Sequence, residues 1–221
     1  MSTLYLGNLN YSSWSIRAVL VARGAGLEIT EKVLPLGPDE TYETLLKETR
    51  QHRVPVLVTD DVVIHDSLAI TEWIAEQAPA GKVWPIDPAK RARARSLCAE
   101  MHASFIDIRG DMGVDIRSRL PTPPLTGGLK WDIRRILQIW QETRSAYEAD
   151  GPYLFGEWSA ADAFLMPVAT RFRTYGYELD AEADTYAAAV LAHPLSQQLI
   201  AEAKAEPWTV DFSKFRPKSA G

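Results

Sequence analysis

A cluster of small hydroxyl side chains lies near the start of the chain, where a strand is expected to turn into a helix. The cluster consists of Ser12, Ser13 and Ser15, between the apolar runs 4–6 and 19–22. A helix N-terminus presents free N–H groups and the positive end of the helix dipole, and a serine adds an O–H donor. Such a turn can hold a thiolate anion. The alternative is an ordinary helix cap, for which serine is a favoured residue.

The composition is that of a globular protein with one large domain or two small ones. The 221 residues carry a formal net charge of −5, which leaves no basic footprint for nucleic acid. No apolar run approaches the roughly 18 residues of a membrane span, and no secretory signal pattern is found. The single cysteine, Cys98, excludes an internal disulfide framework and a CxxC redox pair. A cytoplasmic location is therefore expected, with no nucleic-acid or membrane partner.

The first eighty residues alternate between strand and helix signals in the order β-α-β-α-β-β-α. Strands are expected over 3–7, 28–34, 54–58 and 62–64, and helices over 14–23, 39–50 and 67–78. One βαβ unit that leads into an antiparallel hairpin, with helices on both faces, describes a thioredoxin-like layer. We therefore assign residues 1–80 to an α/β domain with this fold.

The remainder of the chain predicts a helical bundle. Residues 81–88 have the Pro-rich and Gly-rich character of a linker, and residues 89–221 show helical periods with little strand signal. Helices are expected over 89–109, 129–150, 159–175, 183–192 and 195–205. The predicted fold class is therefore α/β plus all-α, with an N-terminal βαβαββα domain followed by an all-helical C-terminal domain.

Two further segments of the first eighty residues have residue types that suit a polar ligand. A cis bond between Val54 and Pro55 would turn the Val54 N–H and C=O outward, where an extended peptide could pair with them. The alternative is a trans proline that opens an edge strand. Asp66 and Ser67 precede a helical period, so they can cap that helix, bind a carboxylate and an ammonium group, or do both.

Two other patterns point to structure rather than to ligand binding. Ser159 and Asp162 have the spacing of a capping box, and we expect them to begin the helix over 159–175. The four histidines are scattered, with no pair at i and i+4, so no metal site is expected.

The order of elements and four short motifs resemble the cytosolic glutathione transferases, in particular their Ser-type, theta-like, zeta-like and beta-like bacterial classes. The motifs are the hydroxyl turn that ends at Arg17, Arg53-Val54-Pro55-Val56-Leu57, His65-Asp66-Ser67-Leu68-Ala69-Ile70 and Ser159-Ala160-Ala161-Asp162. The resemblance covers nearly all of the chain. It departs from the family where Gln51-His52-Arg53 replaces Ser-Gly-Lys and Asp66 replaces Glu. Together with the hairpin that follows, it favours a cis Val54–Pro55 bond.

The resemblance implies a glutathione S-transferase, an enzyme that uses glutathione as co-substrate for conjugation to, or isomerisation of, a small electrophile. Ser12 or Ser13 would donate its O–H to the glutathione sulfur. Ser12 is preferred because it stands five residues before Arg17, as in the Cys-type classes, whereas Ser13 has the theta-like spacing. The residues implied to bind glutathione are Trp14, His52, Arg53, Val54, Pro55, Asp66 and Ser67.

The resemblance also implies an electrophile pocket and a homodimer. The candidates for the pocket are Met101, His102, Phe105, Arg109, Phe172 and Tyr175. An alternative is a non-catalytic protein on the same scaffold that binds apolar ligands or protein partners. A thiol reductase is disfavoured, because that chemistry needs a cysteine at the turn and Cys98 is remote from it in sequence.

Overall fold

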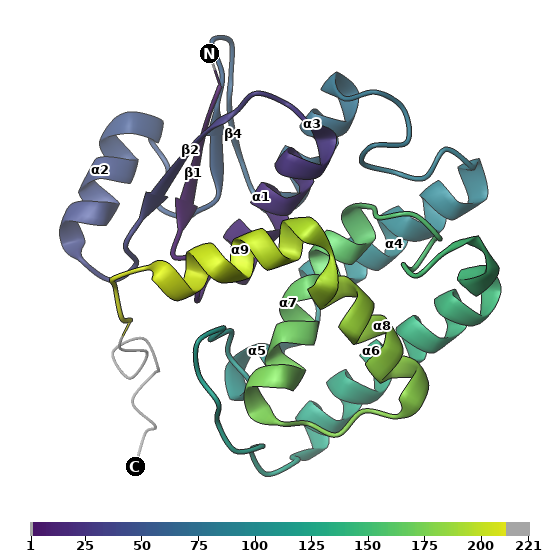
Figure 1. The fold of residues 1–221 in the computed structure, drawn as a ribbon. Coiled ribbons are helices and arrows are strands. Elements are labelled where there is room, and N and C mark those ends of the chain that lie inside the picture. The colour runs from purple at the N-terminus through teal and green to yellow at the C-terminus, as the bar shows by residue number, and fades with distance from the viewer. Residues whose placement is uncertain (1, 211–221) are drawn as a thin grey trace.

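The computed structural model describes residues 2–210, so the last part of the expected helical domain, 211–221, lies outside the described residues. A four-stranded sheet with the strand order β2-β1-β3-β4 forms the first half of the molecule (Figure 1). Its strands are β1 (Thr3–Gly7), β2 (Thr30–Leu34), β3 (Val56–Val58) and β4 (Val63–His65). β1 pairs with β2 in parallel and with β3 antiparallel, and β3 and β4 form the predicted hairpin.

Alternation along β1 decides which helix covers which face of the sheet. Leu4 and Leu6 belong to the main apolar core, on the face covered by α1 (Ser13–Ala25) and α3 (Ser67–Gln77). Tyr5 points to the other face, where α2 (Asp39–Thr49) contributes Leu45 to a smaller cluster. The element order confirms the predicted thioredoxin-like layer.

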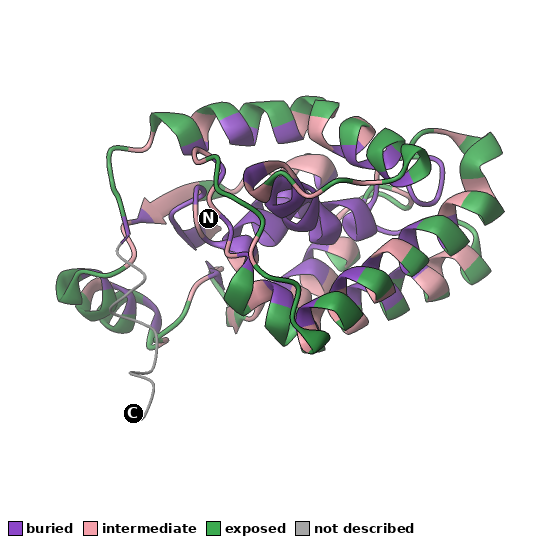
Figure 2. Ribbon diagram, turned by 90° about the horizontal axis from the view of Figure 1, so that it is seen from below, coloured by how far each residue is buried: buried purple, intermediate pink, exposed green. Residues whose placement is uncertain are grey.

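The second half of the molecule is helical. It consists of α4 (Pro88–Ala103), α5 (Ile106–Asp111), α6 (Gly127–Tyr147), the 3-10 turn η1 (Glu148–Asp150), α7 (Ala160–Tyr175), α8 (Ala181–Ala192) and α9 (Pro194–Ala205). α7 is buried along nearly its whole length and contacts α1, α4 and α8. Figure 2 shows the buried residues gathered in the middle of the molecule, while the peripheral helices are exposed on their outer sides.

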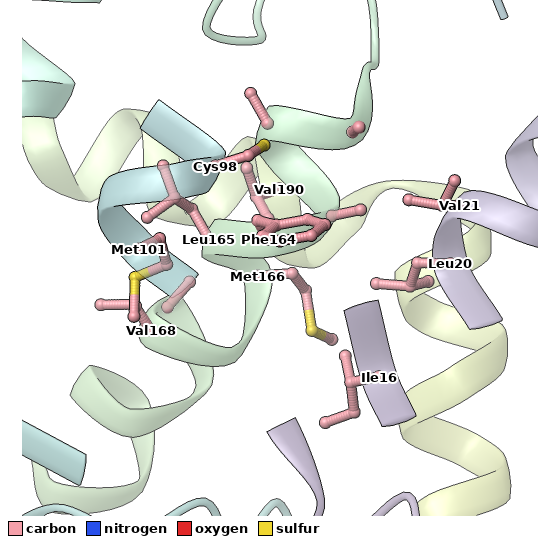
Figure 3. Packing of buried hydrophobic residues seen from close by; sticks show 14 of the residues in the cluster. Ile16, Leu20, Val21, Cys98, Met101, Phe164, Leu165, Met166, Val168 and Val190 are labelled. Carbon is pink, nitrogen blue, oxygen red and sulfur yellow. The ribbon is translucent and has the colours of Figure 1, made fainter. Parts of the chain in front are cut away.

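α1 lies at the interface between the two halves and packs against α7. Ile16 and Leu20 of α1 point toward Phe164 and Met166 of α7 in one continuous core (Figure 3). The chain that connects the halves is also packed, because Val83 is buried and its C=O accepts the first free N–H of α7, from Ala160, at 2.9 Å. α1 therefore packs against elements of both halves, namely α3 and β1 in the first and α7 and α9 in the second.

The helix predicted over 89–109 is wrong in its length. α4 ends at Ala103, Phe105 takes a left-handed backbone conformation (φ 65°), and α5 is a separate short helix. Phe105 is buried at this break, and the Arg109 guanidinium donates to the backbone carbonyls of Met101 and Ser104. These contacts satisfy carbonyls that the end of α4 leaves unpaired. The composition of the segment carries no Gly or Pro signal for such a break.

Within residues 2–210, no helix combines the length and the apolar composition that a membrane span requires.

Candidate functional site

The hydroxyl turn forms the N-terminus of α1. Ser12 is the N-cap residue, and Ser13 is the first residue of the helix. The turn before them is closed by the Asn8 C=O, which accepts from Tyr11 N at 3.1 Å and Ser12 N at 2.8 Å. The N–H groups of Ser13 and Trp14 make no backbone hydrogen bond within residues 2–210, and with the positive end of the α1 dipole they lie beside the serine hydroxyls.

The three serine side chains of this turn are bonded differently. Ser12 Oγ accepts from Ser15 N at 3.2 Å and lies 2.9 Å from Ser15 Oγ. Ser15 Oγ accepts in turn from Gly7 N at 2.9 Å, so it joins the helix to the end of β1. The Ser13 hydroxyl has no hydrogen bond to another group in residues 2–210, although Ser13 is buried. The expected cap at Ser12 is present and does not exclude a ligand-binding role.

Residues of the helical half hold the turn before α1 in place by hydrogen bonds. Asn10 is fully buried, donates from Nδ2 to Asp115 Oδ1 at 2.9 Å, and accepts from Arg117 N at 2.9 Å. The Glu206 carboxylate accepts from the backbone N–H groups of Leu9 (2.6 Å) and Asn10 (3.1 Å). The position of the serines therefore depends on residues about one hundred and two hundred positions away in the sequence.

A cleft of about 450 Å³ opens beside the turn. It is lined by Trp14, Gln51, His52, Arg53, Val54, Pro55, His65, Asp66 and Ser67. The structure thus brings together all seven residues proposed to bind glutathione, and it adds Gln51 and His65. The Val54–Pro55 bond is cis, as favoured from the sequence. Ser12 and Ser13 are not on the cleft wall, and Trp14 is the lining residue from their helix.

The N-terminus of α3 forms part of the cleft lining. Asp66 is its N-cap residue, and its Oδ1 accepts from Leu68 N at 2.7 Å and from Ala69 N at 3.4 Å. The Ser67 side chain is fully buried, and its hydroxyl has no hydrogen-bond partner in the described part of the chain. A buried hydroxyl without a partner is costly, so this one favours a ligand that accepts or donates a hydrogen bond. Both the capping and the ligand-binding roles of Asp66 are compatible with this geometry.

Three arginines make the region behind Trp14 positively charged. The Arg17 guanidinium is fully buried, lies 4.7 Å from the Trp14 ring and has no hydrogen-bond partner in residues 2–210. Arg109 lies 4.9 Å from the same ring, and Arg171 is also buried. Burial, with the charges of Arg109 and Arg171, lowers the pKa of Arg17 well below its usual value. This environment favours an anion near the start of α1.

The six residues suggested for an electrophile pocket do not gather on the wall of this cleft. Met101, Phe105 and Phe172 are buried in the core, and Phe172 packs against Trp140 with ring centroids 5.6 Å apart. Tyr175 is partly buried against the same core. Those that lie nearest the cleft are His102, whose ring meets Trp14 edge-on at 5.2 Å, and Arg109. His102 Nε2 also lies 3.3 Å from Asp66 Oδ2.

Ser159 and Asp162 lie at the N-terminus of α7, and neither residue lines the cleft. The Asp162 carboxylate is fully buried and accepts from Leu154 N (3.1 Å), Ser159 N (3.0 Å), Ser159 Oγ (3.1 Å) and Tyr186 Oη (3.1 Å). Burial raises the pKa of Asp162 to about 6 despite these bonds. The arrangement ties the start of α7 to α8 and to the loop before it, which is a structural role.

Neither a metal centre nor a reactive thiol is found in residues 2–210. Among them, no three His, Cys, Asp or Glu side chains are arranged to hold a metal ion. Cys98 is fully buried in α4, and burial raises the pKa of its thiol well above its usual value. A buried protonated thiol is a poor nucleophile, so a reductase role for Cys98 gains no support.

Some residues of the site have no strong signal in the sequence. Ser15 is one of several hydroxyls in a turn, and Asn10, Arg117 and Glu206 meet only in the folded chain. Gln51 adjoins the predicted His52 and could have been included on that ground.

Comparisons with known proteins point to one family. A family model described as the glutathione S-transferase N-terminal domain matches residues 11–77. The maleylacetoacetate isomerase of Rattus norvegicus is 33% identical over 159 residues, which cover 70% of each chain. The probable maleylacetoacetate isomerase of Caenorhabditis elegans is 35% identical over 85 residues, 38% of this chain and only 39% of that protein.

A solved structure is similar over almost its whole length. It is a glutathione transferase homolog from Burkholderia strain BGR1 with bound glutathione, with a TM-score of 0.68 and 23% identity over 93% of this chain and 99% of that one. This likeness supports the fold, and the rat relative extends the similarity over most of the sequence. The chain belongs to the cytosolic glutathione S-transferase family.

Proposed function

We propose that the protein binds reduced glutathione in the cleft beside α1 and activates its thiol. The observation that carries this proposal is the cleft itself, whose wall holds a buried, unpartnered Ser67 hydroxyl, a carboxylate at Asp66 and an arginine at Arg53. Glutathione offers two carboxylates, an ammonium group, two peptide bonds and a thiol. The polar groups of the cleft complement each of these except the thiol, which is left for the α1 turn.

Each part of glutathione has a matching group. The γ-glutamyl carboxylate would accept from the Ser67 hydroxyl at the α3 N-terminus, and its ammonium group would lie against Asp66. Val54 makes no backbone hydrogen bond to residues 2–210, so its N–H and C=O can pair with the cysteinyl residue like an added strand. His52 and Arg53 would contact the glycine carboxylate.

The thiol is activated by stabilising its anion. A free cysteine thiol has a pKa near 8.5, and lowering it by two requires about 2.7 kcal/mol of selective stabilisation. The hydroxyl of Ser12 or Ser13, the N–H groups of α1 and the charge of Arg17 together can supply this amount. The serine acts as a hydrogen-bond donor to sulfur, and the thiol proton leaves to solvent.

The bound thiolate can react in two ways. It can attack a small electrophile and remain attached, which is conjugation. It can also add to a conjugated C=C bond, allow rotation about the resulting single bond and then leave, which is isomerisation with glutathione regenerated. The relatives named maleylacetoacetate isomerase make the second reaction the first one to assay.

We also propose that the protein is a homodimer. β4 is an edge strand of the sheet, and Val62 and Val63 in its hairpin are 45% and 40% exposed. An edge with exposed valines is commonly covered in an assembly. The expected mass in light scattering is that of two chains, and Val63→Lys should weaken the association.

The test of the proposed function is glutathione binding measured by calorimetry. Ser67→Ala and Asp66→Asn should each weaken binding about tenfold or more, because the first removes a hydrogen bond to the ligand carboxylate and the second removes the negative charge that faces its ammonium group. Ser96→Ala is the matched control, since Ser96 is exposed in α4 and its hydroxyl donates to Ala92 O in its own helix. Absence of glutathione binding to the wild type would refute the proposal.

A second candidate function is a non-catalytic binding protein on this scaffold. It predicts glutathione uptake without turnover, or no uptake at all. Assays with an activated aryl chloride and with a cis-unsaturated diketo acid distinguish it from the enzyme.

A further inference from the structure

A chain of hydrogen bonds runs from the end of β1 to the N-cap of α1 through Ser15. Gly7 N donates to Ser15 Oγ at 2.9 Å, and Ser15 Oγ lies 2.9 Å from Ser12 Oγ. Ser15 N also donates to Ser12 Oγ, at 3.2 Å. Ser15 is fully buried, so water does not compete for its hydroxyl.

The number of protons in this chain limits how it can be used. A serine hydroxyl has one proton to donate and two lone pairs to accept with. The 2.9 Å separation of Ser12 Oγ and Ser15 Oγ fits a bond donated in either direction. If Ser12 donates to Ser15, Ser12 has no proton left for a ligand. If Ser15 donates to Ser12, both lone pairs of Ser12 are filled and its only proton is free.

We propose that Ser15 is the positioning residue for thiol activation, an inference that rests on the proposed function above. When glutathione binds, the Ser15 O–H points to Ser12 Oγ, and the Ser12 O–H points to the sulfur. Gly7 N–H fills one lone pair of Ser15 Oγ, and within residues 2–210 Ser12 Oγ is the acceptor that lies within reach of the Ser15 proton. No covalent bond of either serine breaks, and the thiol proton goes to solvent.

This arrangement favours Ser12 over Ser13 as the donor to sulfur. The Ser12 hydroxyl is held by two donors, whereas the Ser13 hydroxyl has no such partner in residues 2–210. A hydroxyl that accepts two hydrogen bonds is a stronger donor, because hydrogen bonds in a chain polarise one another. A fixed rotor also loses less entropy when the ligand binds.

A double-mutant cycle on Ser12 and Ser15 tests the proposal. The pKa of the glutathione thiol is measured in each complex from the pH dependence of thiolate absorbance. Ser15→Ala should raise this pKa by about 0.5 to 1, and it should lower kcat/KM three- to tenfold below that pKa. In the Ser12→Ala background, Ser15→Ala should have no further effect on the pKa. Ser15→Thr, which keeps the hydroxyl, should restore it, and Ser96→Ala should leave it unchanged.

The cycle distinguishes a failure of the proposed function from a failure of the proposed role of Ser15. A wild type that does not bind glutathione, or binds it with an unshifted thiol, refutes the proposed function. A wild type with a lowered thiol pKa that Ser15→Ala leaves unaltered, or alters equally in the Ser12→Ala background, refutes the role of Ser15 alone. A fall in melting temperature without a change in pKa has the same meaning, because it marks a structural role.

If the Ser15 variants do not fold, a measurement on the wild type tests the positioning role of Ser15. The Gly7 amide donates to Ser15 and has no expected contact with glutathione, so its proton chemical shift reports the state of the Ser15 hydroxyl. In the glutathione complex this shift should titrate with the pKa of the bound thiol. In the complex with S-methylglutathione, which has no ionisable thiol, the titration should be absent. A Gly7 signal indifferent to the thiol refutes the proposal.

Discussion

Two helices of this molecule begin with a serine followed three residues later by a second polar side chain, and the two N-termini are used differently. At α7 the pair is Ser159 and Asp162, and the carboxylate accepts four hydrogen bonds in the core. At α1 the pair is Ser12 and Ser15, two neutral hydroxyls beside an open cleft.

The N-termini of α7 and α1 differ in whether a side chain of the protein supplies a negative charge to the positive end of the helix. The positive end of α7 already has the carboxylate of Asp162, so it has no electrostatic need for an anionic ligand. The positive end of α1 has no acidic residue in its first turn, and Arg17 adds positive charge behind it. The same local spacing therefore gives a structural cap where a carboxylate closes it and a candidate anion site where only hydroxyls do.

Removal of the carboxylate at α7 should have the largest effect. Asp162→Ala leaves Leu154 N, Ser159 N and Tyr186 Oη without their buried acceptor, which should reduce the free energy of unfolding by about 3–5 kcal/mol. Denaturant unfolding measures this change. The fraction that folds should bind glutathione with normal affinity. A variant that is as stable as the wild type but has lost glutathione binding would reverse the assignment of the two N-termini.

The charge of Asp162 should make stability depend on pH. Because burial raises the pKa of Asp162 from 3.8 to about 6, the unfolded chain ionises first as pH rises. The wild type should therefore lose about 3 kcal/mol relative to Asp162→Asn between about pH 4 and pH 6, with little change above that. Unfolding curves of both proteins across this range measure the difference. A difference that does not vary with pH would show that the carboxyl titrates normally in the fold.

Ser12→Ala tests the other N-terminus. Loss of a hydroxyl donor to the thiolate should reduce turnover at neutral pH about 10- to 100-fold, since a hydrogen bond to a charged group contributes roughly 1.5–3 kcal/mol. Loss of the cap should reduce the free energy of unfolding by only about 1 kcal/mol. Steady-state kinetics and denaturant unfolding give the two numbers. Full turnover in Ser12→Ala, in Ser13→Ala and in the double variant would remove both serines from the mechanism.

Ser159→Ala is the matched change at α7 and should have the smallest effect. It removes one neutral donor to Asp162 and should reduce the free energy of unfolding by about 1 kcal/mol, with no change in turnover. A loss of turnover comparable to that of Ser12→Ala would mean that both N-termini affect the reaction only through folding.

The cleft was more predictable from the sequence than the rest of the site. Most of its wall comes from one segment, from Gln51 to Ser67, where a hairpin brings the two ends together. Local patterns therefore carry most of the information. The clamp on Asn10 by Arg117 and Glu206 joins residues far apart in the sequence, and no local pattern encodes it.

The helical half shows the same limit. Periodicity predicts the helices correctly to within a few residues, apart from the break at Phe105. That break is accompanied by hydrogen bonds from Arg109 to the carbonyls of Met101 and Ser104. Intrinsic helix propensity does not predict such contacts. An electrophile pocket depends on how such helices pack, so its residues stay a prediction.

The central claim is that the open N-terminus of α1 keeps the sulfur of bound glutathione ionised. The most direct test is the pKa of that thiol in the wild-type complex, measured from thiolate absorbance as a function of pH. We expect a pKa about two below the value near 8.5 of a free cysteine thiol. A bound thiol that titrates like the free one would contradict it.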